Sequence, residues 1–293
     1  MSAMRPGKFA MTASDRYIGV IRAFMECGWQ PVKLFSSPIT DPMSSNRQVI
    51  ALAQQHNIPI QLNRMDERDL AGLRNDGCEL LVLASYQWRG GNWAAYLPRA
   101  INFHPAPLPR YRGPYPLVQG ILDRRSVWAT TCHKVATEFD AGDILAARHF
   151  DLGVNECHES LDLKAQIETA QLASTVAQDI DRLWDAAVPQ TAGTYIKMWT
   201  DADREIDFHC TVHEIDLKLR AFGNFECLAR VNGMQYFVRR AVCWPVQHNC
   251  APGALAHVDG SRYVIACKDG CVALLDWSLV PPGVRIASAD RQG

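Results

Sequence analysis

The chain has 293 residues, of which 48% are hydrophobic and 21% charged, as expected of one or two globular domains with apolar cores. Its net charge of −1 provides no overall attraction to nucleic acid or to anionic membranes. Residues 1–14 lack the features of a secretory leader, and no segment approaches the roughly 18 uninterrupted apolar residues of a membrane helix. We therefore expect a cytoplasmic protein with no membrane span.

The first half of the chain alternates short apolar runs with helical patterns. Strands are predicted at 8–12, 32–35, 58–62 and 79–84, and helices at 15–27, 46–56 and 66–74. This order predicts an α/β fold, in which a Rossmann-like parallel sheet carries helices on both faces. The turn at residues 12–16 contains no Gly-x-Gly-x-x-Gly sequence, so the usual dinucleotide-binding motif is absent.

A further strand is predicted at Ala100–His104, and it places Asn102 and His104 on one face because strand side chains alternate. The following segment, 105–116, contains five prolines and cannot continue a hydrogen-bonded ladder. The chain must therefore leave the sheet as a stiff loop. Asn102 and His104 are then expected at the carboxyl edge of a parallel strand, where ligands bind in open α/β sheets.

The second half changes character near residue 200. A strand at 144–150 is followed by a long helix at 159–184, whose apolar stripe runs through Leu163, Ile167, Ala173 and Ala177. After a connector come short β-like runs at 236–242, 254–258, 263–267 and 272–277, separated by Gly-containing turns. We predict two domains, residues 1–200 and 201–293, of which the second is small, mostly β and OB-like.

The residue types between 100 and 144 suit acyl transfer to an amine. Histidine can move protons near neutral pH, and an asparagine amide can donate a hydrogen bond to a developing oxyanion. A carboxylate can orient the imidazole and stabilise its charged form. Asp140, in a turn ahead of the strand at 144–150, is the candidate carboxylate. Asn102, His104 and Asp140 are therefore the predicted catalytic residues.

Three separated motifs resemble those of the folate-dependent formyltransferase family. They are Asn102-Phe103-His104-Pro105, Leu108-Pro109-Arg110-Tyr111-Arg112-Gly113 and Phe139-Asp140-Ala141-Gly142-Asp143-Ile144. The family includes methionyl-tRNA formyltransferase, glycinamide ribonucleotide formyltransferase, and enzymes that formylate nucleotide-linked amino sugars or N-hydroxyornithine. The resemblance implies that 10-formyltetrahydrofolate is the formyl donor and that Asn102, His104 and Asp140 are catalytic.

The resemblance also implies which residues bind the two substrates. The folate is expected at two loops, through Ser85, Tyr86, Gln87, Trp88, Thr137, Phe139 and Asp143. The amine is expected beside the first turn and the Pro-rich loop, through Ser14, Arg16, Pro105, Arg110, Arg112 and Tyr115. Alternatively, Tyr86 and Trp88 pack in the core, and the two loop arginines are solvated charges.

The ten cysteines and nine histidines raise the question of a metal site. No two cysteines have Cys-x-x-Cys spacing, and neighbours such as Cys132 and His133 would face opposite sides of a strand. We expect the cysteines to be small buried side chains with free thiols, and we expect no metal cofactor.

The acceptor amine is less determined than the chemistry. From residue 204 onward ten Lys and Arg oppose nine Asp and Glu, and a difference of +1 is a weak basis for binding tRNA. We therefore expect a small-molecule amine, such as a nucleotide-linked amino sugar or N-hydroxyornithine, and no nucleic acid partner. A methionyl-tRNA formyltransferase, a 10-formyltetrahydrofolate hydrolase and a catalytically silent binding protein stay open, as does a homodimer.

Overall fold

The computed structural model describes residues 7–38, 45–86, 88 and 91–281. The chain divides into two compact units, which we call the N-terminal and C-terminal units. The first comprises Met1–Gly113, Val127–Asp151 and Leu163–Tyr195, and the second Pro114–Ser126, Leu152–Asp162 and Ile196–Gly293. The chain therefore passes from one unit to the other more than once, and the single domain boundary expected near residue 200 stays a prediction.

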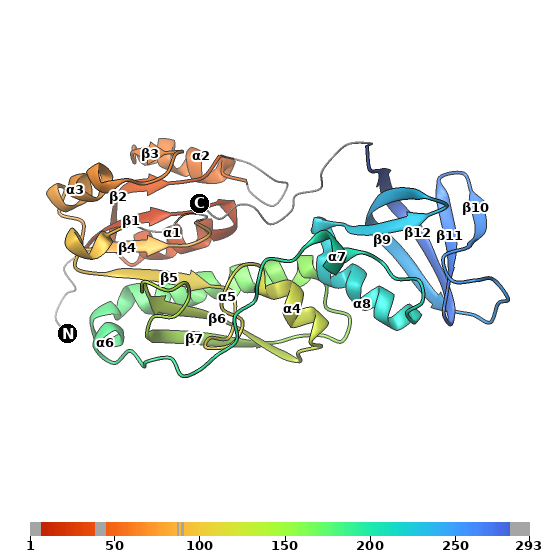
Figure 1. Ribbon diagram of the computed structural model, residues 1–293. Coiled ribbons are helices and arrows are strands. Elements are labelled where there is room, and N and C mark those ends of the chain that lie inside the picture. Colours follow the sequence, from red (N-terminus) through yellow and green to blue (C-terminus); the bar gives the residue numbers. More distant parts are fainter. Residues whose placement is uncertain (1–6, 39–44, 87, 89–90, 282–293) are drawn as a thin grey trace. The chain divides into compact units, whose positions relative to one another are not determined.

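The N-terminal unit is built on a seven-stranded sheet in the order β3-β2-β1-β4-β5-β6-β7 (Figure 1). The strands are β1 Lys8–Thr12, β2 Gln30–Phe35, β3 Ile60–Gln61, β4 Leu80–Leu83, β5 Ala100–His104, β6 Val127–Lys134 and β7 Ile144–Asp151. Strands β1 to β5 are parallel to one another, whereas β6 pairs antiparallel with β5 and β7 pairs antiparallel with β6. The predicted α/β fold is confirmed, and β6 is a strand that the sequence analysis missed.

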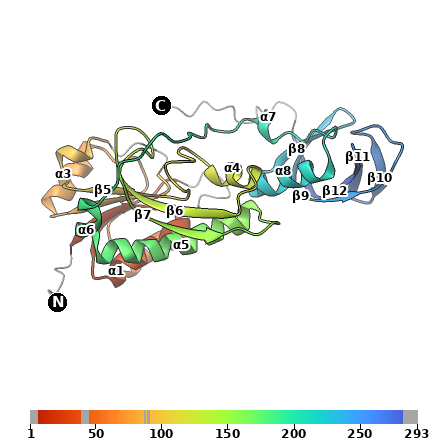
Figure 2. The same cartoon turned by 90° about the horizontal axis from the view of Figure 1, so that it is seen from below.

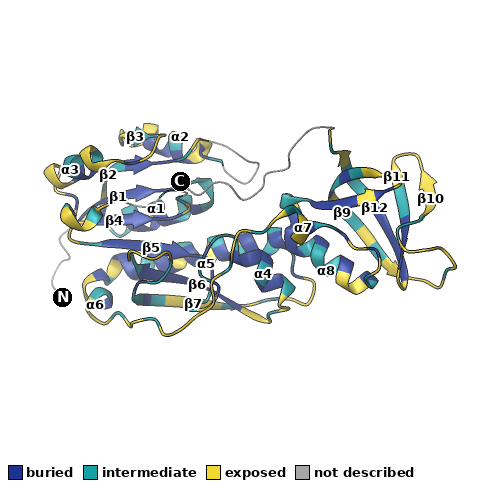
Figure 3. Cartoon of the chain, viewed as in Figure 1, coloured by how far each residue is buried: buried dark blue, intermediate teal, exposed yellow. Residues whose placement is uncertain are grey.

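Helices cover both faces of this sheet, as predicted. They are η1 Asp15–Tyr17, α1 Ile18–Glu26, α2 Arg47–Gln55, α3 Glu67–Asn75, η2 Trp93–Ala95, α5 His158–Gln178 and α6 Ile180–Asp185. On one face α1, α2 and α5 enclose a core that includes Phe24, Leu52 and Val176, and Figure 2 shows α1 and α5 on the same side. On the other face α3 contributes Leu70 and Leu73. Strands β1 and β4, between these layers, are buried along almost their whole length (Figure 3).

The long helix expected at 159–184 is two helices, because α5 ends at Gln178 and α6 begins at Ile180. The predicted stripe is also wrong in part, since Leu163 and Ile167 are 59% and 58% exposed. The side chains buried along α5 include Leu172 and Val176. Apolar residues occur on more than one side of this helix, so periodicity alone did not identify the side that meets the sheet.

The C-terminal unit contains a five-stranded antiparallel sheet in the order β10-β11-β12-β9-β8. Its strands are β8 Cys227–Val231, β9 Met234–Pro245, β10 Leu255–Asp259, β11 Arg262–Cys267 and β12 Gly270–Leu279, and its helices are α4 Pro116–Leu122, α7 Asp201–Arg204, α8 Val212–Phe222 and η3 Gly223–Phe225. The mostly-β character of this part of the chain is confirmed. The four predicted runs correspond to β9 through β12, and β8 was not predicted.

All ten cysteines carry free thiols, and among them Cys250 is exposed. Burial raises the pKa of Cys78 to about 11 and the pKa values of Cys227 and Cys243 to about 12. These thiols stay protonated at neutral pH. None of the helices in the described part of the chain is long and apolar enough to span a membrane.

Candidate active site

Strand β5 positions the first two polar residues of the site. It pairs with β4 on one side and with β6 on the other, where Asn102 lies opposite His133 and His104 opposite Thr131. Ile101 and Phe103 point into the hydrophobic core. Because side chains alternate along a strand, Asn102 and His104 share the opposite face, as the sequence analysis predicted.

Residues 135–143, which we call the Asp140 loop, connect β6 to β7 and supply the carboxylate. The loop closes tightly, because the Lys134 N–H donates to the Asp143 carbonyl at 2.9 Å. At Gly142 a Cβ atom would lie 1.9 Å from the Lys134 carbonyl oxygen, so no side chain fits there. Asp140 adopts a left-handed conformation with φ of 54°. Together these features turn the Asp140 carboxylate back toward β5.

The three predicted catalytic side chains meet in one cluster within the N-terminal unit. Oδ1 of Asp140 lies 3.2 Å from Asn102 Nδ2 and 3.6 Å from His104 Nδ1. The other carboxylate oxygen accepts a hydrogen bond from the Gly113 N–H at 2.9 Å. His104 is 5% exposed, and the Asp140 side chain is 12% exposed. Residues separated by about forty positions are thus in contact, although their catalytic roles stay a prediction.

A fourth side chain, His133 of β6, was not predicted. Its Nε2 lies 3.0 Å from Asn102 Nδ2 and 3.5 Å from Asp140 Oδ1. Its Nδ1 is 2.8 Å from the Lys134 carbonyl oxygen, which can only accept, so Nδ1 carries a proton. With the proton on Nδ1, Nε2 can accept from the Asn102 amide. The β-branched and aromatic run at 127–134 is a strand signal, but the pairing of β6 with β5 is a long-range property.

His104 is held in one tautomer by the Pro-rich loop. Its Nε2 is 2.8 Å from the carbonyl oxygen of Tyr111, so Nε2 carries the proton and Nδ1 faces Asp140. Burial lowers the pKa of His104, while Asp140 and the Tyr111 carbonyl oppose that decrease. The imidazole is therefore neutral at pH 7, with an unprotonated nitrogen directed toward a carboxylate.

The Asp140 carboxylate is ionised over the whole physiological range. Burial acts to raise its pKa, but His104, His133 and the Gly113 N–H outweigh burial and lower the pKa to about 2. An ionised carboxylate beside a neutral histidine can stabilise that histidine when it gains a proton. The pair is thus arranged for proton transfer through His104.

The Pro-rich loop forms a fixed wall next to this cluster. The Trp128 indole N–H donates to the Pro105 carbonyl at 2.8 Å, and the Thr131 hydroxyl donates to the Ala106 carbonyl at 2.7 Å. The rings of Tyr111 and Trp128 lie 4.8 Å apart. These contacts tie the loop to β6, so the Tyr111 carbonyl that orients His104 is itself held in place.

The residues predicted to bind folate divide into two groups. Ser85, with φ of 54°, is exposed at the end of β4, and Thr137 and Phe139 are exposed on the Asp140 loop. Tyr86, in contrast, accepts a hydrogen bond from the Met65 N–H at 2.8 Å and packs against the core, which is the alternative interpretation given above. The Trp88 ring lies 5.2 Å from the Tyr86 ring. The Asp143 carboxylate forms an ion pair with Lys134 at 3.3 Å. Gln87 lies outside the described residues.

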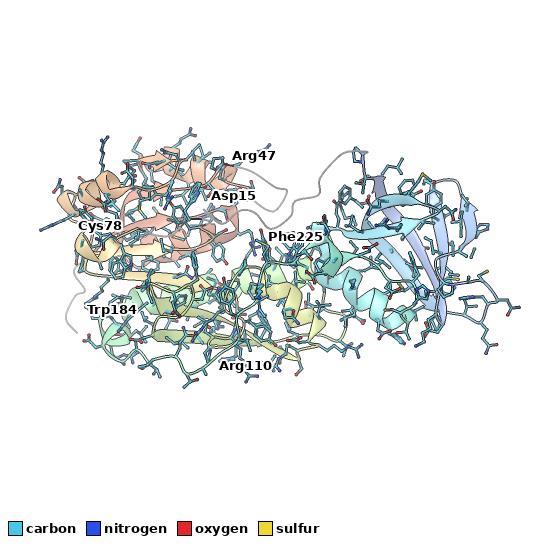
Figure 4. All side chains as sticks on the ribbon, viewed as in Figure 1. Asp15, Arg47, Cys78, Arg110, Trp184 and Phe225 are labelled. Carbon is cyan, nitrogen blue, oxygen red and sulfur yellow. The ribbon has the colours of Figure 1, made fainter. Side chains whose placement is uncertain are left out.

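The residues predicted to bind the amine lie in different surroundings. The Ser14 hydroxyl, at the end of β1, is buried and has no hydrogen-bond partner among the described residues. The Arg16 guanidinium lies 5.8 Å from the Tyr17 ring. Arg110, labelled in Figure 4, is exposed. Tyr115 belongs to the C-terminal unit, where its ring lies 4.9 Å from that of Phe225.

A cavity of about 310 Å³ opens beside the Asp140 loop. It is lined by Arg112, Glu138, Phe139, Gly193, Thr194 and Tyr195. Phe139 and Tyr195 are 48% and 54% exposed, so they present aromatic surface there. Within the described residues, no group of three or more His, Cys, Asp or Glu side chains is arranged to hold a metal ion.

The comparison with known families assigns the chain to a class. Residues 42–176 match the formyl transferase model, and residues 198–280 match the model of the formyl transferase C-terminal domain. The chain belongs to the formyltransferase family.

Relatives found by sequence similarity carry the name methionyl-tRNA formyltransferase. The methionyl-tRNA formyltransferase of Alcanivorax borkumensis is 27% identical over 86% of this chain and 76% of its own length. That of Orientia tsutsugamushi is 26% identical over 94% of this chain and 83% of its own length. Both relatives are thus similar to this chain across both units.

Solved structures share the fold at lower identity. The N-formyltransferase of Helicobacter canadensis, crystallised with folinic acid and dTDP-3-aminofucose, has a TM-score of 0.66 at 13% identity and covers 94% of this chain and 100% of its own. HypX from Aquifex aeolicus has a TM-score of 0.66 at 16% identity, covering 92% of this chain but 44% of its own. At these identities the likeness concerns the fold.

Proposed function

We propose that the protein transfers a formyl group from 10-formyltetrahydrofolate to the amine of a small-molecule acceptor. The observation that carries the proposal is the contact between Asn102, His104 and Asp140 in a buried cluster at the carboxyl edge of the sheet. A neutral imidazole, an ionised carboxylate and an amide are the groups that formyl transfer to an amine needs. Candidate acceptors are nucleotide-linked amino sugars and N-hydroxyornithine-like amines.

In this mechanism His104 handles the protons. Its Nδ1, unprotonated at pH 7, takes the proton that the attacking amine nitrogen loses as the new C–N bond forms. The resulting imidazolium is stabilised by Asp140, 3.6 Å away. His104 then returns the proton to the nitrogen of the donor as the old C–N bond breaks, so charge and protons balance. The donor supplies the formyl group itself.

Asn102 is the candidate for stabilising the formyl oxygen as it gains negative charge. In the structure its amide nitrogen already contacts His133 at 3.0 Å and Asp140 at 3.2 Å. Since an amide has two hydrogens, donation to an oxyanion requires one of these contacts to be exchanged. The longer contact, to Asp140, is the one that such an exchange would release.

Two loops are the candidates for binding the donor. The exposed Ser85 and Phe139 lie on the two loops that the family resemblance assigns to the folate, and both loops contain a residue with positive φ. Backbone N–H and carbonyl groups of such loops can bind the polar edge of a pterin. We assign the pterin to these two loops and require no metal.

One finding favours a second candidate, a methionyl-tRNA formyltransferase. The relatives from Alcanivorax borkumensis and Orientia tsutsugamushi carry that name. Against it stands the charge of the chain from residue 204 onward, where ten basic residues oppose nine acidic ones. A polyanionic tRNA is bound through excess positive charge, so we favour the small amine.

The test is an acceptor screen with 10-formyltetrahydrofolate, with tetrahydrofolate release and product mass as readouts. It includes dTDP- and UDP-amino sugars, N-hydroxyornithine and methionyl initiator tRNA. Formylation of a small amine is expected. Formylation of the tRNA alone would establish the second candidate, release without any amine would identify a hydrolase, and no release under any condition would refute formyl transfer.

A further inference from the structure

Residues 188–195, which we call the strap, run along the outside of the candidate active site within the N-terminal unit. Val188 exchanges two backbone hydrogen bonds with Ile144, at 2.8 and 2.9 Å. Farther along, the Thr194 carbonyl accepts from the Arg112 N–H at 2.9 Å, and the Thr194 hydroxyl accepts from the Tyr111 N–H at 2.9 Å. The strap is therefore attached both to β7 and to the Pro-rich loop.

The strap also approaches the Pro-rich loop too closely for a side chain. A Cβ atom built on Gly193 would lie 1.8 Å from the carbonyl oxygen of Pro109. Any residue other than glycine would push the two backbones apart. This close approach fixes the distance between the strap and the Pro-rich loop.

Gln190 lies between these attachments, and its side chain points at the Asp140 loop. Its Nε2 donates to the Asp140 carbonyl oxygen at 2.8 Å and to the Gly142 carbonyl oxygen at 2.7 Å. Its Oε1 accepts from Arg112 Nε at 3.0 Å. Both amide hydrogens and the amide oxygen are thus used, and one orientation of the side chain satisfies all three contacts.

Asp140 needs such support because its backbone is held in the left-handed region, with φ of 54°. For a residue other than glycine this conformation is disfavoured, least so for aspartate and asparagine, and contacts with the surrounding residues keep it in place. Gln190 holds the backbone carbonyl of Asp140, while the Gly113 N–H holds the carboxylate at 2.9 Å. Arg112 contacts Gln190 and directly precedes Gly113 in the chain. The hydrogen bond to the Asp140 backbone and the one to its carboxylate are therefore linked through adjacent residues.

We propose that Gln190 is a positioning residue, which keeps the Asp140 carboxylate facing His104 from outside the reacting cluster. The proposal rests on the proposed function for its kinetic consequence. A purely structural role for the strap is the alternative, in which loss of Gln190 lowers stability and leaves the relation between Asp140 and His104 unchanged.

The kinetic test compares Gln190→Ala with Thr191→Ala. Thr191 is the neighbouring strap residue and contacts Arg112 through its backbone carbonyl, which the substitution keeps. For Gln190→Ala we expect kcat to fall about 10- to 100-fold, with KM for the formyl donor within about threefold of the wild type, because misplacement acts on the transition state. Thr191→Ala should match the wild type. A KM effect without a kcat effect would overturn the proposal.

A double-mutant cycle shows whether Gln190 acts through Asp140. In the Asp140→Asn background, adding Gln190→Ala should lower kcat by less than about twofold, since the carboxylate that Gln190 positions is already absent. If the decrease of kcat in the double variant equals the product of the decreases in the two single variants, Gln190 acts independently of Asp140. Should Gln190→Ala fail to fold, Gln190→Glu keeps the size of the side chain and replaces its donors by a carboxylate, and wild-type kcat in that variant would equally refute the proposal.

A readout that does not need activity separates this inference from the proposed function. The ring of His104 is faced by Asp140, His133 and the Tyr111 carbonyl, and Asp140 acts to raise its pKa. If Gln190→Ala releases Asp140, NMR titration should show a lower His104 pKa than in Thr191→Ala. An unchanged titration would refute the positioning role, whether or not an acceptor amine is found.

Discussion

At the scale of single residues, the site depends on which nitrogen of His104 carries the proton. The Tyr111 carbonyl fixes that proton on Nε2 and leaves Nδ1 facing Asp140. The tautomer is therefore set by the backbone of the Pro-rich loop and not by the carboxylate. The carboxylate acts later, on the charged form of the ring.

Replacement of His104 tests this assignment directly. We expect His104→Asn to lower formyl transfer on the order of 10²- to 10⁴-fold, because the proton carrier is lost. The matched control is His149→Ala, since His149 is an exposed histidine on β7. Tetrahydrofolate release gives the rate, and circular dichroism checks that both variants are folded. Equal rates in the two variants would show that His104 is not the proton carrier of the reaction.

The depressed pKa of Asp140 predicts how stability responds to acid. The carboxyl titrates at 3.8 when unfolded and at about 2 when folded, so its contribution is present above pH 3.8 and is lost as the pH falls toward 2. The shift corresponds to about 2 kcal/mol. Asp140→Asn should lose this contribution and show a flatter decline between pH 4 and 2 in urea unfolding. A decline as steep as that of the wild type would show that other groups are responsible.

At the scale of elements, the Asp140 loop is held by a close approach of two backbones at Gly142. A Cβ there would lie 1.9 Å from the Lys134 carbonyl oxygen, so Gly142→Ala forces β6 and β7 apart. We expect destabilisation of about 2 kcal/mol or more. In the matched control, Gly72→Ala in α3, the new methyl meets nothing within 4 Å. That change should stabilise the protein by about 0.5–1 kcal/mol. Opposite signs in thermal melting are the expected result.

Elements that the sequence predicted are those whose signals are local. The apolar runs that become β1 and β4 and the alternation of Asn102 and His104 along β5 need no knowledge of distant residues. The partners of β5 were not predictable in this way. His133 enters the site because β6 returns antiparallel beside β5, and that register depends on the whole sheet.

The strap illustrates the same limit more strongly. Gln190 is fifty positions from Asp140 and lies in a connector with no strand or helix pattern. Its importance follows from hydrogen bonds to backbone carbonyls, which any residue provides and which leave no trace in composition. The stripe on α5 failed for a related reason, since Leu163 and Ile167 form a regular helical pattern that is nevertheless exposed.

At the scale of the whole molecule, charge is the property that separates the two candidate functions. The chain carries a net charge of −1. The comparisons do not make the distinction, because a structure with this fold was solved with an amino-sugar nucleotide, whereas relatives by sequence carry a name that refers to tRNA. A difference in long-range electrostatics should therefore be visible in binding experiments before any acceptor is identified.

We predict that the protein binds tRNA weakly, with a Kd of about 10 μM or higher at 150 mM salt, as for non-specific association. The measurement is a fluorescence titration with labelled initiator tRNA at several salt concentrations. A bacterial methionyl-tRNA formyltransferase serves as the positive control. Submicromolar binding with a steep salt dependence would reverse our preference for a small amine.

The state of the thiols has a practical consequence for such experiments. Since nine of the ten cysteines are buried or half-buried and Cys250 is exposed, a maleimide dye should attach at Cys250 under native conditions. The dye would then report from the C-terminal unit, to which Cys250 belongs. Although the chain has ten cysteines, it can thus be labelled at one site without mutagenesis. The fluorescence of the dye can then follow the binding of candidate ligands in real time.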